Sequence, residues 1–116
     1  LDGIKNSLIR VCDQNISLVL TTGGTGLSKR DNTPEATKAV IEKEVQGISE
    51  AMRYHSLQIT PRAMLSRGVS GIRQNSLIIN LPGSPKAVRE NLEYIIPSLR
   101  HGLEILRGEA SNCARK

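Results

Sequence analysis

Residues 16–26, ISLVLTTGGTG, place a short apolar run directly before a loop built only from threonine and glycine. The run from Ile16 to Leu20 predicts a buried strand, so the loop falls where an α/β sheet passes its chain to a helix. Small side chains let backbone N–H groups approach a ligand closely, and hydroxyls add hydrogen-bonding groups. The stretch therefore predicts an α/β fold with a phosphate-binding loop, the glycine loop, formed by Thr21, Thr22, Gly23, Gly24, Thr25 and Gly26.

A helix start follows the glycine loop. Thr33 and Pro34 predict an N-cap and a proline at the first helical position, and the pattern continues over residues 34–45. The amino end of a helix favours negative charge. Asp31, just before this helix, has two interpretations that the spacing leaves open: it complements the helix dipole, or it binds Mg²⁺ and orients a phosphate.

Apolar residues at helical spacing predict two further helices, over residues 4–12 and 48–55. Thr60 and the proline after it start a short helix that ends near residue 65. Ser84 caps the last predicted helix, which breaks or bends at Pro97. Helices therefore occupy much of the chain on both sides of the predicted strands.

The apolar run over residues 76–81 predicts a second strand, buried on both faces. Residues 66–73 alternate only weakly, which fits an irregular strand or a loop. The order of elements predicts a three-layer αβα fold with a mostly parallel sheet and helices on both faces. Ligands of such sheets bind beyond the carboxyl ends of the strands. We therefore expect the glycine loop to form one pocket with the turn at Pro82, Gly83 and Ser84.

Three other polar residues are candidates for the site. Asn80 lies inside an apolar strand, and a buried amide needs partners, which a ligand ring can supply. Ser66 and Arg67 fit either an exposed loop or a phosphate or pterin contact. His55 and His101 have no serine or acidic partner at a catalytic spacing, which argues against hydrolytic or zinc chemistry.

Composition limits the class of partner. The chain has 116 residues, enough for one domain, and a net charge of +5 that favours an anionic partner. Its aromatic content is 2%, which supplies little stacking for nucleic-acid bases, and a phosphate-bearing small molecule fits the charge as well as a polymer does. Among the candidate functions nucleic-acid binding ranks last. With neither a signal peptide nor a membrane span in the sequence, we expect a cytoplasmic protein, with Cys12 and Cys113 as free thiols.

Taken in order, the motifs of the chain resemble the molybdopterin-binding domain of molybdenum cofactor biosynthesis. This domain occurs in the bacterial molybdopterin adenylyltransferases, in the gephyrin G domain and in the plant counterpart. The resemblance covers most of residues 16–106. It is carried by residues 21–26, Arg30-Asp31, Thr33-Pro34-Glu35-Ala36-Thr37, Met64-Leu65-Ser66-Arg67, Gly71-Ile72-Arg73 and residues 77–84.

The resemblance implies an activity: Mg²⁺- and ATP-dependent transfer of AMP to the terminal phosphate of molybdopterin, with release of pyrophosphate. It further implies a homotrimer and a molybdate insertase as partner. Asp31 would be the catalytic and Mg²⁺-binding acid, and the glycine loop would hold phosphate. The pterin and phosphate pocket would be lined by Ser66, Asn80, Pro82, Gly83 and Ser84. The alternative is a non-catalytic molybdopterin-binding or scaffold domain of the same pathway.

Members of this family carry several tens of residues before the position of Leu1, including a strand that ends in a Ser-Asp pair and a further acidic segment. The resemblance therefore implies a molybdopterin-binding domain over residues 1–107 that is incomplete at its start. Part of the sheet and one acidic contribution to the active site would lie outside it. Residues 108–116 form a polar tail that we expect to fray.

Overall fold

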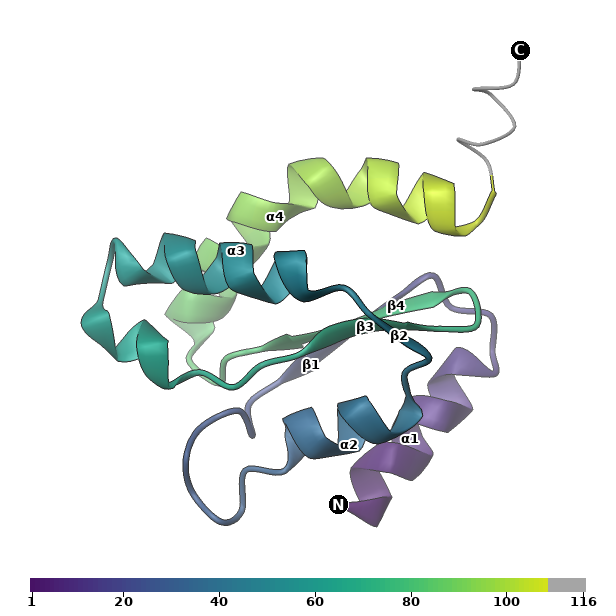
Figure 1. Ribbon diagram of the computed structural model, residues 1–116, viewed down its shortest axis with the longest axis horizontal. Helices are drawn as coiled ribbons and strands as arrows, with labels where there is room; N and C mark the ends of the chain where they lie inside the picture. Colours follow the sequence, from purple (N-terminus) through teal and green to yellow (C-terminus); the bar gives the residue numbers. More distant parts are fainter. Residues whose placement is uncertain (109–116) are drawn as a thin grey trace.

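The computed structural model describes residues 1–108 as a sheet between two layers of helices (Figure 1). The sheet has four strands in the order β1-β4-β3-β2, with bounds β1 Leu18–Thr22, β2 Lys43–Glu44, β3 Ser70–Arg73 and β4 Ser76–Leu81. Helices α1 (Asp2–Cys12) and α2 (Thr33–Val40) cover one face. The other face is covered by α3 (Gln46–Leu57) and α4 (Pro85–Leu106), with the short 3₁₀ helix η1 (Pro61–Leu65) after α3.

The predicted three-layer α/β fold is confirmed, but the sheet is mixed rather than mostly parallel. Strand β1 runs parallel to β4, whereas β3 is antiparallel to both β4 and β2. The reason is a tight turn at residues 74–75, where Gln74 adopts a left-handed conformation with φ of 54° and returns the chain as a hairpin. The weakly alternating segment is thus a strand, β3.

Several element bounds differ from the prediction: α1 starts two residues earlier, α3 is two residues longer at each end, and β1 and α2 are displaced. Strand β1 lies two residues later than expected, so Thr21 and Thr22 belong to the strand and not to the loop. The N-cap of helix α2 is Asn32, one residue before the expected cap at Thr33. The helix ends at Val40, because Ile41 is extended with a ψ of 150°. Of the residues that were expected to continue the helix, Lys43 and Glu44 form β2 instead. Its pairing with β3 requires Gly71, where a Cβ would lie 2.7 Å from the carbonyl oxygen of Lys43.

The caps predicted at Thr60 and Ser84 are confirmed, since each side chain accepts a hydrogen bond from the first turn that follows. Helix α4 continues through Pro97 and is bent rather than broken (Figure 1). Proline removes one helical hydrogen bond but leaves the rest of the helix to packing. Among residues 1–108 we find no helix with the length and apolar character needed to cross a bilayer.

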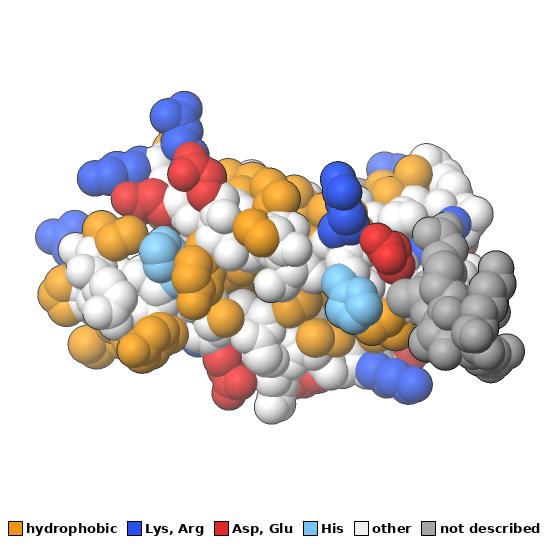
Figure 2. All heavy atoms as spheres, turned by 90° about the horizontal axis from the view of Figure 1, so that it is seen from above, with side chains coloured by type: hydrophobic (Ala, Val, Ile, Leu, Met, Phe, Trp, Pro, Cys, Tyr) orange, Lys and Arg blue, Asp and Glu red, His pale blue; other side chains and the backbone are white. Residues whose placement is uncertain are grey.

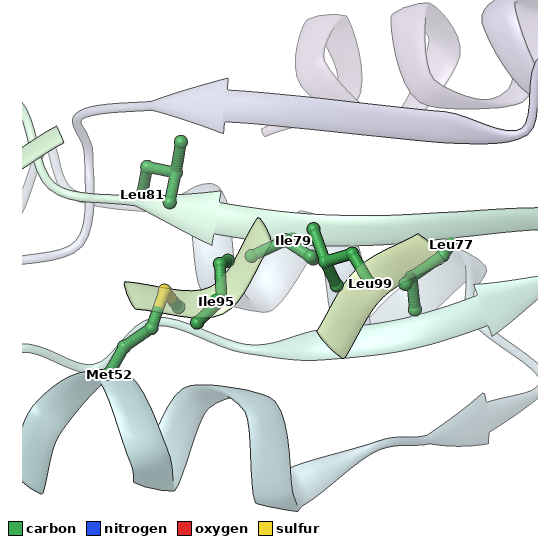
Figure 3. Close-up of a cluster of buried hydrophobic side chains, with 6 residues drawn as sticks. All are labelled: Met52, Leu77, Ile79, Leu81, Ile95 and Leu99. Carbon is green, nitrogen blue, oxygen red and sulfur yellow. The ribbon is translucent and has the colours of Figure 1, made fainter. Parts of the chain in front are cut away.

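The core lies on both faces of β4. Side chains of β4, α3 and α4 form one cluster, drawn in Figure 3: Met52, Leu77, Ile79, Leu81, Ile95 and Leu99. On the opposite face Ile78 packs with Val19, Leu8 and the buried, free thiol of Cys12. Cys113 and the predicted tail, apart from Gly108, lie outside the described residues. Both faces of β4 are buried, and β4 carries one half of the site described next.

Candidate functional site

The glycine loop and the turn after β4 meet at one edge of the sheet, as predicted from the sequence. Thr22 pairs with Leu81 at the carboxyl ends of the parallel strands, and the N–H of Gly23 donates to the carbonyl of Leu81 over 3.0 Å. A Cβ at Gly83 would lie 3.4 Å from the Cα of Gly23, which itself has a φ of +82°. The absence of side chains at this contact lets the two backbone segments approach each other closely beside the N-terminus of α4.

Asn80 fixes the strand end. Its amide nitrogen donates to the hydroxyls of Thr21 and Thr37, each over 3.0 Å, and its carbonyl oxygen accepts from the N–H of Val69. The residue is 2% exposed. Both amide hydrogens are therefore used inside the protein, and the role the structure gives this side chain is to tie β1 and α2 to β4.

Arg67 braces the glycine loop with its whole guanidinium group. Its Nε donates to the carbonyl of Gly26 over 2.7 Å and its Nη2 to the carbonyl of Asp31 over 2.6 Å. Its Nη1 bonds Glu35 on α2 at 2.6 Å, and its backbone N–H donates to the carbonyl of Thr25. One side chain thus holds loop carbonyls and a helix carboxylate that lie up to 41 residues away from it in the sequence. Sequence spacing carries no signal for this role.

The Glu35–Arg67 pair gives the brace a pH dependence. The hydrogen bond from Arg67 holds the pKa of the Glu35 carboxyl below its usual value of 4.5. A carboxyl with a lowered pKa in the folded protein stabilises the fold above its unfolded pKa, and this contribution is lost as the pH falls through the folded pKa. The brace therefore weakens only in acid.

We expect Glu35→Gln to lower the thermal unfolding midpoint at pH 7, because the ion pair with Arg67 is lost. The difference from the wild type is expected to shrink as the pH falls below about 4.5. Thermal melts of both proteins across this range measure it. Glu93→Gln, which removes an exposed carboxylate from α4, is the matched control. A difference that persists unchanged in acid would contradict the assignment of the ion pair.

The carboxylate of Asp31 lies next to Gly26 of the glycine loop. One carboxylate oxygen accepts from the N–H of Ser28 over 3.0 Å, and a Cβ at Gly26 would lie 2.9 Å from the same oxygen. The other oxygen has no hydrogen-bond partner among residues 1–108. Within the described chain no three His, Cys, Asp or Glu side chains gather as metal ligands. A free carboxylate oxygen fits Mg²⁺ that is also held by substrate phosphates, the usual mode for this ion.

A cavity of about 290 Å³ opens beside the loop. It lies between the glycine loop, α3, η1 and the first turns of α4, and Thr25, Gly26, Ser66, Asn80 and Pro82 of the predicted site residues line it. The other predicted residues do not line it: Thr21, Thr22, Gly23, Gly24, Asp31, Gly83 and Ser84. The site therefore has two parts, a cavity and the adjoining Gly23–Gly83 contact.

Helices supply cavity residues that sequence reasoning missed. Arg53 on α3 donates to the carbonyl of Gly68 over 3.0 Å, and Glu90 and Asn91 come from α4. Such single helical positions have no motif around them. Near the cavity, exposed hydrophobic side chains gather over the end of α3 and η1 (Figure 2). Tyr54 and Met64 are among the exposed hydrophobic residues of these two elements.

The chain belongs to the family described as the probable molybdopterin binding domain, whose sequence pattern matches residues 1–101. Molybdopterin adenylyltransferase of Helicobacter pylori strain J99 is 51% identical over 108 residues, which are 92% of this chain and 61% of that protein. Gephyrin of Dictyostelium discoideum is 51% identical over 94% of this chain and 15% of its own length. The predicted family is confirmed.

Solved structures show the same fold. The molybdopterin biosynthesis protein Mog of Mycobacterium ulcerans superimposes with a TM-score of 0.88 at 37% identity, over 91% of this chain and 70% of that one. The molybdopterin biosynthesis enzyme MoaB of a Thermus species gives 0.86 at 50% identity, over 92% and 68%. The chain thus spans about three fifths of the H. pylori enzyme and about two thirds of these structures.

Proposed function

We propose that this protein adenylylates molybdopterin in molybdenum cofactor biosynthesis, using ATP and Mg²⁺ and releasing pyrophosphate. The observation that carries the proposal is the adjacency of three features at one sheet edge: the Gly23–Gly83 contact, the Asp31 carboxylate and the cavity. Adenylyltransferases at 51% identity, of which the chain spans 61%, support the reaction class.

The two parts of the site suit two parts of the substrate. A cavity of about 290 Å³ is at the small end of ligand pockets and matches a single ring system better than a whole substrate with its nucleotide. The substrate phosphate would then lie at the Gly23–Gly83 contact, near the amino end of α4, whose dipole favours an anion. We propose the tricyclic pterin in the cavity and its phosphate on this glycine contact.

The reaction needs orientation and charge stabilisation more than a covalent nucleophile. An oxygen of the molybdopterin phosphate attacks the α-phosphorus of ATP, and the bond to pyrophosphate breaks on the opposite side. Asp31 would hold Mg²⁺ through its free oxygen, and the ion would neutralise nucleotide phosphates. Arg67 would keep the loop carbonyls fixed while this charge develops.

The test is pyrophosphate release by the purified protein with molybdopterin, ATP and Mg²⁺, and with each of the three omitted in turn. We expect release only when all three are present, and adenylyl-molybdopterin as the second product. Molybdopterin binding without any turnover would instead identify a non-catalytic molybdopterin-binding or scaffold domain.

We further propose, on the family resemblance, that the working form is a cytoplasmic homotrimer that passes its product to a molybdate insertase. We also propose that residues 1–107 act as one functional unit, with residues 108–116 as a tail. Light scattering of the purified protein tests the trimer, and co-purification with the insertase tests the partner.

A further inference from the structure

The amide of Asn91 is buried with half of its hydrogen-bonding capacity unused. The side chain of this α4 residue is 4% exposed, and its carbonyl oxygen accepts from the hydroxyl of Ser56 over 2.9 Å. Its Nδ2 has no hydrogen-bond partner among residues 1–108. Because polar atoms of buried side chains are nearly always paired, the surroundings of this nitrogen show what it can bind.

The free nitrogen reaches the cavity. Asn91 and Ser56 both line it, so the bonded pair stands in the cavity wall. In the described chain the only side-chain nitrogen or oxygen that is wholly buried without a partner is Nε of Arg73. Nδ2 of Asn91 therefore retains contact with open space, and the space that this buried residue adjoins is the cavity.

Asn91 differs in this respect from Asn80, the other buried asparagine of the cavity lining. Asn80 is 2% exposed and donates both amide hydrogens to threonine hydroxyls of the protein. Asn91 uses only its carbonyl oxygen, and the hydroxyl of Ser56 fixes the orientation of the amide. Asn80 thus stabilises the fold, whereas Asn91 presents a fixed donor to a ligand.

Glu90 adds an acceptor to the wall of the same cavity. It precedes Asn91 on α4, is partly buried and lines the same cavity, and no ion pair or hydrogen bond engages its carboxylate within residues 1–108. A carboxylate accepts hydrogen bonds only, whereas Nδ2 only donates them. A ring edge that carries an acceptor next to an N–H or amino group is complementary to this pair.

We propose that Asn91 and Glu90 are specificity-determining residues that read the ring edge of the bound heterocycle. Nδ2 of Asn91 donates to a ring carbonyl or ring nitrogen, and the carboxylate of Glu90 accepts from the ring N–H or 2-amino group. This rests on the proposed function, because it takes the cavity as the pterin subsite. It adds the orientation of the ring, with the amino-oxo edge toward α4 and the phosphate side toward Gly23 and Gly83.

The test compares two probes, 6-hydroxymethylpterin and the matching lumazine, in which oxygen replaces the 2-amino group. Binding is followed by fluorescence. We expect Asn91→Leu to weaken binding of both probes about 10-fold, because the donor is lost. Glu90→Gln is expected to reduce the preference for pterin over lumazine about 10-fold, because the charged acceptor becomes a neutral amide that can also donate to the lumazine oxygen. In turnover of molybdopterin, Asn91→Leu should raise KM more than it lowers kcat.

Two further variants keep the outcome clear. Asn91→Asp preserves the shape and the acceptor for Ser56 but replaces Nδ2 by oxygen, so it tests the donor even if Asn91→Leu folds poorly. Glu93→Gln, outside the cavity on the same helix, is the control for Glu90→Gln and should change neither probe's affinity.

Unchanged probe affinity and unchanged KM in both Asn91 variants would overturn the assignment of Asn91 as the ring-edge donor. If the wild-type protein still turns over molybdopterin, the proposed function stands in that case. Failure of the wild-type protein both to bind the pterin and to release pyrophosphate would overturn the two together.

Discussion

Asp31→Asn is expected to lower the rate of adenylyl transfer by about 100-fold, while the affinity for molybdopterin changes little. The carboxylate lies under the glycine loop with one oxygen free, and it does not line the cavity. Asparagine keeps an oxygen that can accept from the N–H of Ser28 but removes the negative charge that Mg²⁺ needs. Loss of kcat with unchanged binding is the signature of an interaction made with the metal and nucleotide rather than with the pterin.

Pyrophosphate release at saturating ATP, measured over a series of Mg²⁺ concentrations, checks this expectation. Asp13→Asn, at the end of α1, is the matched control because it removes an exposed carboxylate away from the loop. An Asp31→Asn protein that turns over at the wild-type rate would assign Asp31 to the helix dipole alone, the other interpretation that its spacing allows.

Gly24→Ala is expected to lower the free energy of unfolding by about 2–4 kcal/mol and to abolish phosphate binding at the loop. Gly24 has a φ of +72°, where an L side chain is strained, and its Cβ would lie 2.2 Å from the hydroxyl of Thr33. The carbonyl of Gly24 also accepts from the N–H of Thr33 at the start of α2. The overlap is relieved only if the buried side chain of Thr33 rotates or the start of α2 moves.

Urea unfolding of the two proteins measures the effect. The control is Gly102→Ala, because a Cβ at this α4 position meets no atom within 4 Å and alanine favours a helix by about 0.5–1 kcal/mol. We expect the control to be as stable as the wild type or slightly more stable. Equal stabilities for Gly24→Ala and the wild type would mean that the loop has another conformation in solution.

The sequence predicts this fold well where one local pattern decides an element. The apolar run of β4 and the caps at Thr60 and Ser84 needed no tertiary information, and each is found where expected. The parallel neighbours β1 and β4 bring the glycine loop and the Gly83 turn together, as their order along the chain predicts.

Prediction failed where partners distant in sequence decide the structure. Residues 43–44 belong to a helical pattern but pair with β3, because Gly71 lets the strands approach. Asn80 is held by threonines of β1 and α2, partners that its strand pattern does not reveal. The brace by Arg67 and the free amide of Asn91 depend on contacts 41 and 35 residues away, for which a single sequence carries no pattern.

The parallel contact between β1 and β4 has a consequence for folding kinetics. The hydrogen bond from Asn80 to Thr21 spans 59 residues, so the sheet edge that carries both glycine turns closes only after a long loop has been ordered. The β3–β4 hairpin, in contrast, joins neighbours in sequence. We expect the hairpin to form early and the glycine contact to form late, so that a bound phosphate slows unfolding far more than it speeds folding.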